Sequence, residues 1–214
     1  MQEDYLMSLL ECLVGLALSL ILVAPLIKNS GELLVKQIAL EKTHSLALEA
    51  DRALELIGRS IRMAGYQNAQ SFLEGKRKPQ PETDFIRIQK NNGYRGSDSL
   101  IVQHELSPGV DFDCIGNTLS KERTKNALAH QGFLVDRQAS APKGVRVNGG
   151  SLICQSLDRQ GRLQNTTLMN GVHLLSVSEL EGRSGRAFKV RIEMTDGALI
   201  HQGFERTFAT RNLL

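Results

Sequence analysis

The chain has 214 residues, with 26 lysine and arginine side chains against 23 aspartate and glutamate side chains, and a net charge of +3. This mixed balance excludes the strongly basic surface that marks a dedicated nucleic-acid-binding protein. Aromatic residues make up only 5% of the chain and tryptophan is absent, so we expect a core built mainly from leucine, isoleucine and valine.

An apolar stretch at residues 7–27 is the first predicted element. Glu11 is its only charged residue, and its length suffices for a helix that crosses the roughly 30 Å hydrocarbon core of a bilayer. A cleaved secretory signal peptide is the alternative, but such a peptide has a basic start and a small-residue cleavage site. Glu3 and Asp4 are acidic, and the stretch continues through Lys28 into helical sequence. We therefore predict a retained membrane helix.

Residues 28–66 continue in a helical pattern, with apolar side chains at three- and four-residue steps on one face. These are Leu46, Ala50, Ala53, Leu54, Ile57, Ile61 and Ala64. Pro25 lacks a backbone N–H, which predicts a kink within the apolar stretch. Gly65 is placed to cap the end of the helix.

Residues 67–84 are polar and proline-containing, and they predict an irregular loop. Its basic cluster, residues 76–78, would contact DNA or acidic lipid if it had a function. Three basic residues fall short of the longer tracts that bind such polyanions, so a solvated loop is favoured.

From residue 85 the pattern changes to short apolar runs separated by glycine, asparagine and aspartate, which is typical of strands. The predicted strands are residues 85–88, 98–104, 132–135, 145–147, 151–154, 172–180, 187–194 and 204–210, with a turn at residues 91–93. Residues 116–143 otherwise show little pattern. Strands without intervening helices pair antiparallel, so the predicted fold class is α+β, a long N-terminal helix packed on a C-terminal antiparallel sheet.

The predicted division of the chain has four parts. They are residues 1–6, a transmembrane helix (7–27), the amphipathic half of the same helix (28–66) and a β-rich head (67–214). The family resemblance described below implies that residues 1–6 are a leader-like segment and that residues 7–27 are also an assembly helix. The composition changes at Lys28, where the apolar stretch ends.

Three cysteines require explanation. Cys12 lies in the apolar stretch, where a thiol behaves as a small apolar group. Cys114 and Cys154 lie in the predicted head, each beside turn residues and strand-like sequence. In an exported domain such a pair favours one disulfide, because an oxidising compartment preserves it. Two separate buried thiols are the alternative.

No motif for catalysis stands out. The five histidines lack the spacing of a zinc site, and the chain contains no Walker loop, nucleophile elbow or dinucleotide fingerprint. Residues 111–122 have acids at three places of a calcium loop, but Ile115 occupies a place that requires an oxygen ligand. We therefore expect no enzymatic activity, metal or cofactor.

The order Met7-Ser8-Leu9-Leu10-Glu11, followed by the apolar run, resembles the start of type IV pilin-like proteins. The resemblance implies that a prepilin peptidase cuts between Leu6 and Met7 and methylates the new amine. It also implies that Glu11 pairs with the N-terminal amine of a neighbouring subunit. A carboxylate within a membrane helix is costly and usually marks a pairing or functional site.

Two features depart from the family pattern or its topology. Leu6 stands where the family has glycine, and residues 1–6 contain no lysine or arginine. Lys28, Lys36 and Lys42 follow the apolar stretch, and the positive-inside rule alone places that side in the cytoplasm. The resemblance implies the opposite topology, a single-pass inner-membrane protein with a periplasmic head that later enters the pilus.

Several later fragments resemble one branch of the family, the PilW-type minor pilins. They are residues 61–66, 98–102, 113–116, 150–154 and 210–213, which match in order across nearly the whole chain. The resemblance implies a non-enzymatic minor pilin that primes pilus assembly at the filament tip and supports motility, adhesion or DNA uptake. Its partners would be other minor and major pilins; contact with DNA has only the basic cluster in its favour.

Two other functions share part of the pattern. A pseudopilin of a type II secretion system has the same helix and glutamate, and only the later fragments argue against it. A single-pass membrane-anchored envelope protein that binds a ligand would need neither cleavage before Met7 nor Glu11.

Overall fold

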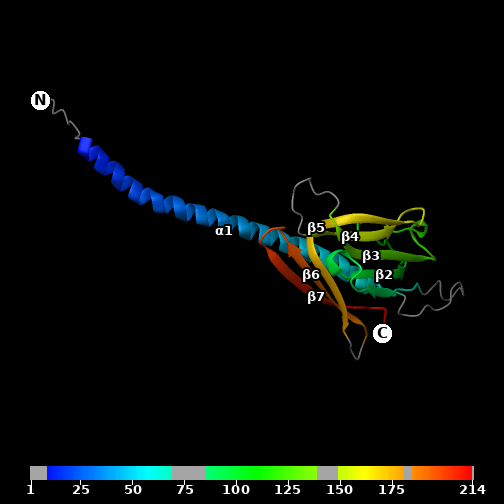
Figure 1. Ribbon diagram of the computed structural model, residues 1–214. Helices are drawn as coiled ribbons and strands as arrows, with labels where there is room; N and C mark the ends of the chain where they lie inside the picture. Colours follow the sequence, from blue (N-terminus) through cyan, green and yellow to red (C-terminus); the bar gives the residue numbers. More distant parts are fainter. Residues whose placement is uncertain (1–8, 69–84, 139–148, 181–184, 214) are drawn as a thin grey trace. The chain divides into compact units, whose positions relative to one another are not determined.

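The structure is a computed structural model, and it describes residues 9–68, 85–138, 149–180 and 185–213 (Figure 1). Its elements are α1 (Leu9–Met63), β1 (Ile86–Gln89), η2 (Tyr94–Gly96), β2 (Ser99–Glu105), η3 (Lys121–Arg123), β3 (Leu128–Arg137), β4 (Gly150–Leu157), β5 (Leu163–Leu180), β6 (Ala187–Thr195) and β7 (His201–Ala209). Two compact units divide the chain, Met1–Thr43 and His44–Leu214. The boundary between the units, after Thr43, lies just before the part of α1 that packs against the sheet. It differs from the change of composition at Lys28, where the apolar stretch ends.

Helix α1 continues without interruption from Leu9 to Met63, so Pro25, where a kink is predicted, does not end the helix. The helix ends at Met63. Gly65 follows with a φ of 71°, the left-handed conformation that closes many helices and that glycine adopts without strain. The predicted capping role of Gly65 is confirmed.

In the second unit, α1 packs against one face of the sheet through the residues that the helical period predicts. Each of them is 9% exposed or less: Leu46, Ala50, Ala53, Leu54, Ile57, Ile61 and Ala64. Phe85, Phe133 and Phe188 are the largest buried side chains that the sheet side contributes to the same core. Figure 1 shows the cyan end of α1 running beside the strands. The head is therefore a helix layer on a sheet layer.

All seven described strands form one antiparallel sheet in chain order, from β1 to β7. The predicted combination of a long N-terminal helix with an antiparallel sheet is thereby confirmed. Strands β1, β2, β4, β6 and β7 lie within a few residues of their predicted positions.

Two strands are longer than predicted, and one connection differs. β3 begins at Leu128 rather than residue 132, and β5 begins at Leu163 rather than residue 172. The polar sequence of residues 163–170 hid the first half of β5, which pairs with β4 while remaining half exposed. The predicted turn at residues 91–93 is part of a longer connection that contains η2. The predicted strand at 145–147 and the basic cluster at 76–78 lie outside the described residues.

Gly58 allows α1 to approach β7. A Cβ atom at this position would lie 2.3 Å from the Cε1 atom of the Phe208 ring, which is closer than any real contact. Phe208 is itself buried, with 7% of its surface exposed. The absence of a side chain at Gly58 therefore sets the distance between the helix and the last strand.

We expect Gly58→Ala to lower the free energy of unfolding by about 1–3 kcal/mol, because overpacking displaces the Phe208 ring. Urea unfolding followed by circular dichroism measures this change. Gly31→Ala is the control, since nothing lies within 4 Å of its Cβ position in the same helix. Equal stability of Gly58→Ala and the unmodified protein would contradict the close contact.

Candidate functional site

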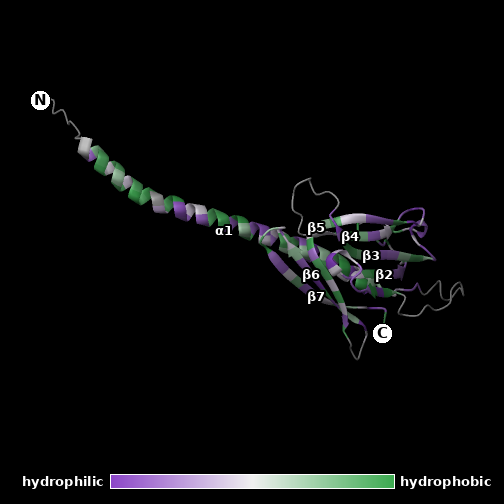
Figure 2. Cartoon of the chain, viewed as in Figure 1, coloured by the Kyte–Doolittle hydropathy of each residue, from purple (hydrophilic) through white to green (hydrophobic). Residues whose placement is uncertain are grey.

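The N-terminal part of α1 is the first candidate site, because its apolar side chains are exposed. Figure 2 shows hydrophobic residues predominating in this part of the helix. Ten large side chains are between 45% and 69% exposed: Leu13, Val14, Leu16, Leu18, Leu20, Ile21, Leu22, Val23, Leu26 and Ile27. Within the described ranges, α1 is the one helix long and apolar enough to cross a membrane.

Keeping these side chains in water would be unfavourable. Full burial of one leucine, isoleucine or valine contributes about 1.5–3 kcal/mol, so the exposed area of this segment corresponds to on the order of 10–20 kcal/mol. That is comparable to the whole folding stability of a typical domain, about 5–15 kcal/mol. The segment therefore requires an apolar environment, either lipid or other helices.

Glu11 lies in the first turn of α1, and its side chain is exposed. The partial positive charge of a helix N-terminus stabilises a carboxylate at this position. Cys12 follows as an exposed free thiol. Leu6 and Met7, the predicted cleavage point, lie outside the described residues.

The head contains the predicted disulfide between Cys114 and Cys154. Their Cα atoms lie 6.1 Å apart and their sequence separation is 40 residues. Cys154 is fully buried on β4, and Cys114 is 4% exposed in the loop that follows β2. The bond attaches this loop to the sheet, which explains how a stretch with little sequence pattern becomes ordered.

A buried ion pair lies next to the disulfide. The Arg123 Nη2 atom donates to the Asp113 carboxylate at 3.0 Å, and Arg123 Nε donates to the Leu157 carbonyl at 2.9 Å. The Asp113 carboxylate also accepts from the backbone N–H groups of Ile115 and Asn117. The guanidinium thus neutralises Asp113, one of the three acids of the calcium pattern, while Asp111 accepts hydrogen bonds from Ser107. Sequence reasoning missed this pair, because nothing in the polar stretch distinguishes Arg123 from its neighbours Lys121 and Lys125.

Asn212 and Leu213 hold the C-terminal tail against the end of α1. Asn212 Nδ2 donates to the carbonyl oxygens of Arg62 at 3.3 Å and Ala64 at 3.2 Å, which caps the helix. Leu213 is 1% exposed and packs on Gly65, where a Cβ atom would lie 2.2 Å from the leucine side chain. Two fragments of the family resemblance, residues 61–66 and 210–213, are therefore in contact.

Another group of hydrogen bonds centres on Asp98, the residue immediately before β2. Its carboxylate accepts hydrogen bonds from Lys90 Nζ at 2.9 Å, Val177 N at 2.9 Å and Asn91 N at 3.2 Å. Burial alone would raise the pKa of Asp98, but these three donors outweigh it and hold the pKa below its ordinary value. The ionised carboxylate therefore links β2 to β5.

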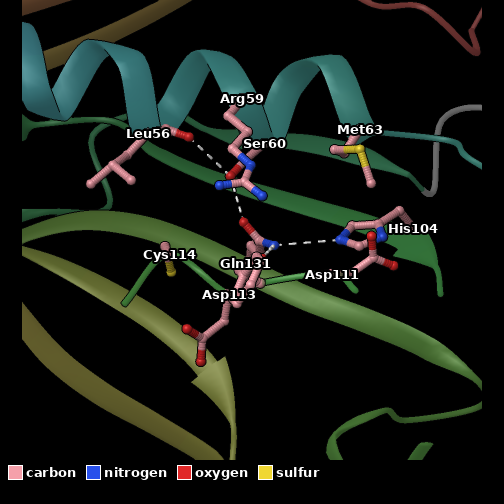
Figure 3. Close-up of a pocket in the computed structure, with 10 residues that line it drawn as sticks. Leu56, Arg59, Ser60, Met63, His104, Asp111, Asp113, Cys114 and Gln131 are labelled. Carbon is pink, nitrogen blue, oxygen red and sulfur yellow. Dashed lines mark hydrogen bonds between the residues drawn. The ribbon is translucent and has the colours of Figure 1, made fainter. Parts of the chain in front are cut away.

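A small polar cavity lies between α1 and the sheet (Figure 3). Its centre is Gln131, which accepts from the Ser60 hydroxyl and donates to the Phe112 carbonyl at 3.1 Å and to His104 Nε2 at 3.4 Å. His104 Nδ1 donates to the Glu105 carbonyl at 2.8 Å. The cavity measures about 20 Å³, which is room for about one water molecule. The network fixes the helix to the sheet rather than holding a larger ligand.

Comparison with known proteins identifies no relative: no protein family, no curated protein and no solved structure matches the chain. The candidate sites therefore depend on their geometry and on the sequence resemblance alone. Among the residues with described positions, no group of three or more histidine, cysteine, aspartate or glutamate side chains is arranged to hold a metal ion.

Removal of the disulfide, by reductant or by combined Cys114→Ser and Cys154→Ser substitution, is expected to lower the free energy of unfolding by about 4 kcal/mol. The loop-entropy relation gives this value for a closed loop of 40 residues. Urea unfolding with and without reductant measures the loss, and Cys12→Ser is the control that should not change it. Recovery of both head thiols alkylated without reductant would contradict the bond.

Stability is expected to fall as the pH decreases through the ordinary histidine pKa of 6.5. Burial lowers the pKa of His104 in the folded state and outweighs the opposing effects of the Glu105 carbonyl and Asp111. The unfolded chain therefore binds the proton first, so acid favours unfolding, with the full stability present above the unfolded pKa. Burial lowers the pKa of His130 too, which adds a loss of the same sign.

Urea unfolding at a series of pH values between neutral and mildly acidic conditions checks this dependence. His104→Asn retains a donor for the Glu105 carbonyl and should reduce the slope of stability against pH. His44→Asn, at an exposed position of α1, should leave the slope unchanged. An identical slope in His104→Asn and the unmodified protein would refute the role of His104.

Proposed function

We propose that the chain is a membrane-anchored, pilin-like subunit, a minor pilin that takes part in type IV pilus assembly at the filament tip without catalysis. One observation carries the proposal: a single continuous helix exposes a membrane-length apolar N-terminal part and, further along, forms a layer of the core of an antiparallel head. The apolar part can lie in lipid before assembly. It can then lie against the apolar helices of other subunits in a filament.

The disulfide supports a head on the oxidising side of the membrane. Disulfides persist in the periplasm and are rare in the cytosol. The Cys114–Cys154 bond therefore argues for a periplasmic head, against the topology that Lys28, Lys36 and Lys42 alone would give. In the proposed arrangement the protein is a single-pass inner-membrane protein that later enters the pilus.

The start of the chain supports the proposed assembly mechanism through its resemblance to the pilin-like family. Glu11 follows the predicted cleavage point by a few residues and lies in the first turn of the described helix. In the proposed mechanism, prepilin peptidase releases the amine of Met7. This amine then forms an ion pair with Glu11 of a neighbouring minor or major pilin, because opposite charges attract strongly in a low-dielectric environment.

The mature N-terminus tests the proposal directly. The chain is co-produced with a prepilin peptidase, purified from membranes and analysed by mass spectrometry. A start at methylated Met7 is the expected result for a minor pilin and for a pseudopilin of a secretion system. An uncleaved N-terminus would overturn both and leave an anchored envelope protein. Recovery in sheared pili then distinguishes the minor pilin from the pseudopilin.

Glu11→Ala is expected to reduce recovery of the protein in sheared pili several-fold and to weaken its crosslinking to other pilins in the membrane. Folding and the disulfide should be unchanged, because the core begins at Leu46. Glu32→Ala, an exposed glutamate on the same helix, is the control. Unmodified levels of both pilus recovery and crosslinking in Glu11→Ala would show that water or lipid headgroups solvate the carboxylate and that it has no assembly role.

A further inference from the structure

Strand β5 changes its pairing partner halfway along its length. Residues 163–172 pair with β4, whereas residues 172–180 pair with β6. The change occurs at Gly171, whose φ of 76° allows the backbone to turn, and the register shifts beside it. The sheet therefore splits at this point, and among the described strands each half of β5 pairs on one side only.

The second half of β5 has its other edge covered by the chain itself. The backbone N–H of Asp98 donates to the Leu175 carbonyl, and the Ser97 hydroxyl accepts from the Leu175 N–H. The Asp98 carboxylate accepts from the Val177 N–H. The short segment at the start of β2 thus satisfies this edge without a strand.

The first half of β5 has no such cover among the described residues. Residues 163–170 pair with β4 on one side, and no described backbone group bonds to the opposite side. This edge contains no charged residue and no proline, which are the usual means by which proteins protect an exposed strand. Nothing in the described part of the chain therefore prevents this edge from pairing with another strand.

A groove of about 390 Å³ lies beside this edge, where β5 faces α1. Leu56, Leu168 and Met169 line it and pack against the buried core, so the groove extends the apolar core toward the surface. Glu49 and Arg52 lie on the helix side of the groove, and neither has an ion-pair partner among the described residues. The groove combines apolar surface with one available charge of each sign.

We propose that the edge of β5 at residues 163–170 receives an extended segment of a different protein chain by strand addition. Backbone hydrogen bonds to the open edge would supply affinity, and alternate side chains of the segment would enter the groove. The segment would carry apolar or β-branched residues at these positions, with a basic residue near Glu49 and an acidic residue near Arg52. The edge and the groove belong to the head alone; the choice of occupant rests on the proposed membrane anchoring, and it holds whether or not the chain enters a pilus.

Symmetry, together with the proposed membrane anchoring, argues against a second copy of this chain as the occupant. Two identical edges pair about a two-fold axis, which makes the strands antiparallel. The same axis reverses the direction of the His44–Met63 part of α1, so the two chains would enter their heads from opposite sides. Chains anchored by their N-terminal helices in one membrane enter from the same side.

A peptide selection tests the inference. The full chain in detergent micelles is screened against a phage-displayed library of short random peptides, and selected peptides are synthesised. We expect peptides with alternating apolar or β-branched residues, whose binding slows amide hydrogen exchange in residues 163–170. N-methylation of alternate peptide amides should weaken binding roughly tenfold or more, because it removes the hydrogen bonds to the edge.

Matched variants locate the site. Thr167→Lys places a charge on the exposed edge and should weaken binding roughly tenfold or more. Thr207→Lys makes the same change at an exposed position of β7 and should leave binding unchanged. Arg52→Glu should shift the selected peptides from acidic to basic residues at the position that faces it. Circular dichroism confirms that each variant is folded.

Four outcomes would overturn the inference. Slow exchange in the unbound protein of those amides in residues 163–170 that do not bond to β4 would show an edge that is already covered. A selection that enriches no peptide would show that the edge binds no extended segment. Selected peptides that bind Thr167→Lys as well as the unmodified chain would place their site elsewhere. A dimer in micelles that Thr167→Lys dissociates would identify a second copy as the occupant.

Discussion

The contact between the C-terminal third of α1 and the sheet is the constraint on which the rest of the head depends. The helix supplies one whole layer of the core, and the strands supply most of the opposite layer, with Phe85, Cys114 and Leu213 beside them. Gly58 sets the distance between the helix and β7, since it accommodates the Phe208 ring, and Gly65 accommodates Leu213 of the C-terminal tail. The hydrogen bond between Ser60 and Gln131 adds a polar contact that only one rotation of the helix satisfies. Apolar packing thus provides stability, and a buried polar pair provides orientation.

The two parts of α1 have surfaces that suit two different environments, an apolar one for the first part and the boundary between the sheet and water for the last part. Its first part exposes apolar side chains around the whole circumference, which is the pattern of a helix in lipid or among other helices. Its last part has one apolar face against the sheet and one polar face in water. Because both parts belong to one helix, the apolar N-terminal part is covalently continuous with the core of the head.

The sequence predicted those elements whose signal is local. Leu46, Ile57 and Ile61 recur at helical spacing, and each is buried. The cysteine pair was also predictable, because an exported domain with two cysteines has few other uses for them. Polar contacts between distant segments were not predictable: Ser60 and Gln131 are 71 residues apart, and Asn212 caps a carbonyl 148 residues away. No local pattern encodes such distances. The first half of β5 escaped prediction for a related reason, since pairing with β4 rather than β propensity makes it a strand.

The contacts between α1 and the C-terminal segment of the chain also determine how the head responds to mechanical load. Asp51 pairs with Arg206, Gly58 contacts Phe208, and the helix end at Ala64 is held by Asn212. The order of these contacts is the same along both segments, so β7 and the tail after it run alongside the helix in the same direction. Tension applied along α1 would therefore act on all three contacts in shear at once, instead of peeling them apart one after another. Force along the helix would therefore reach the last strand through several contacts that share the load.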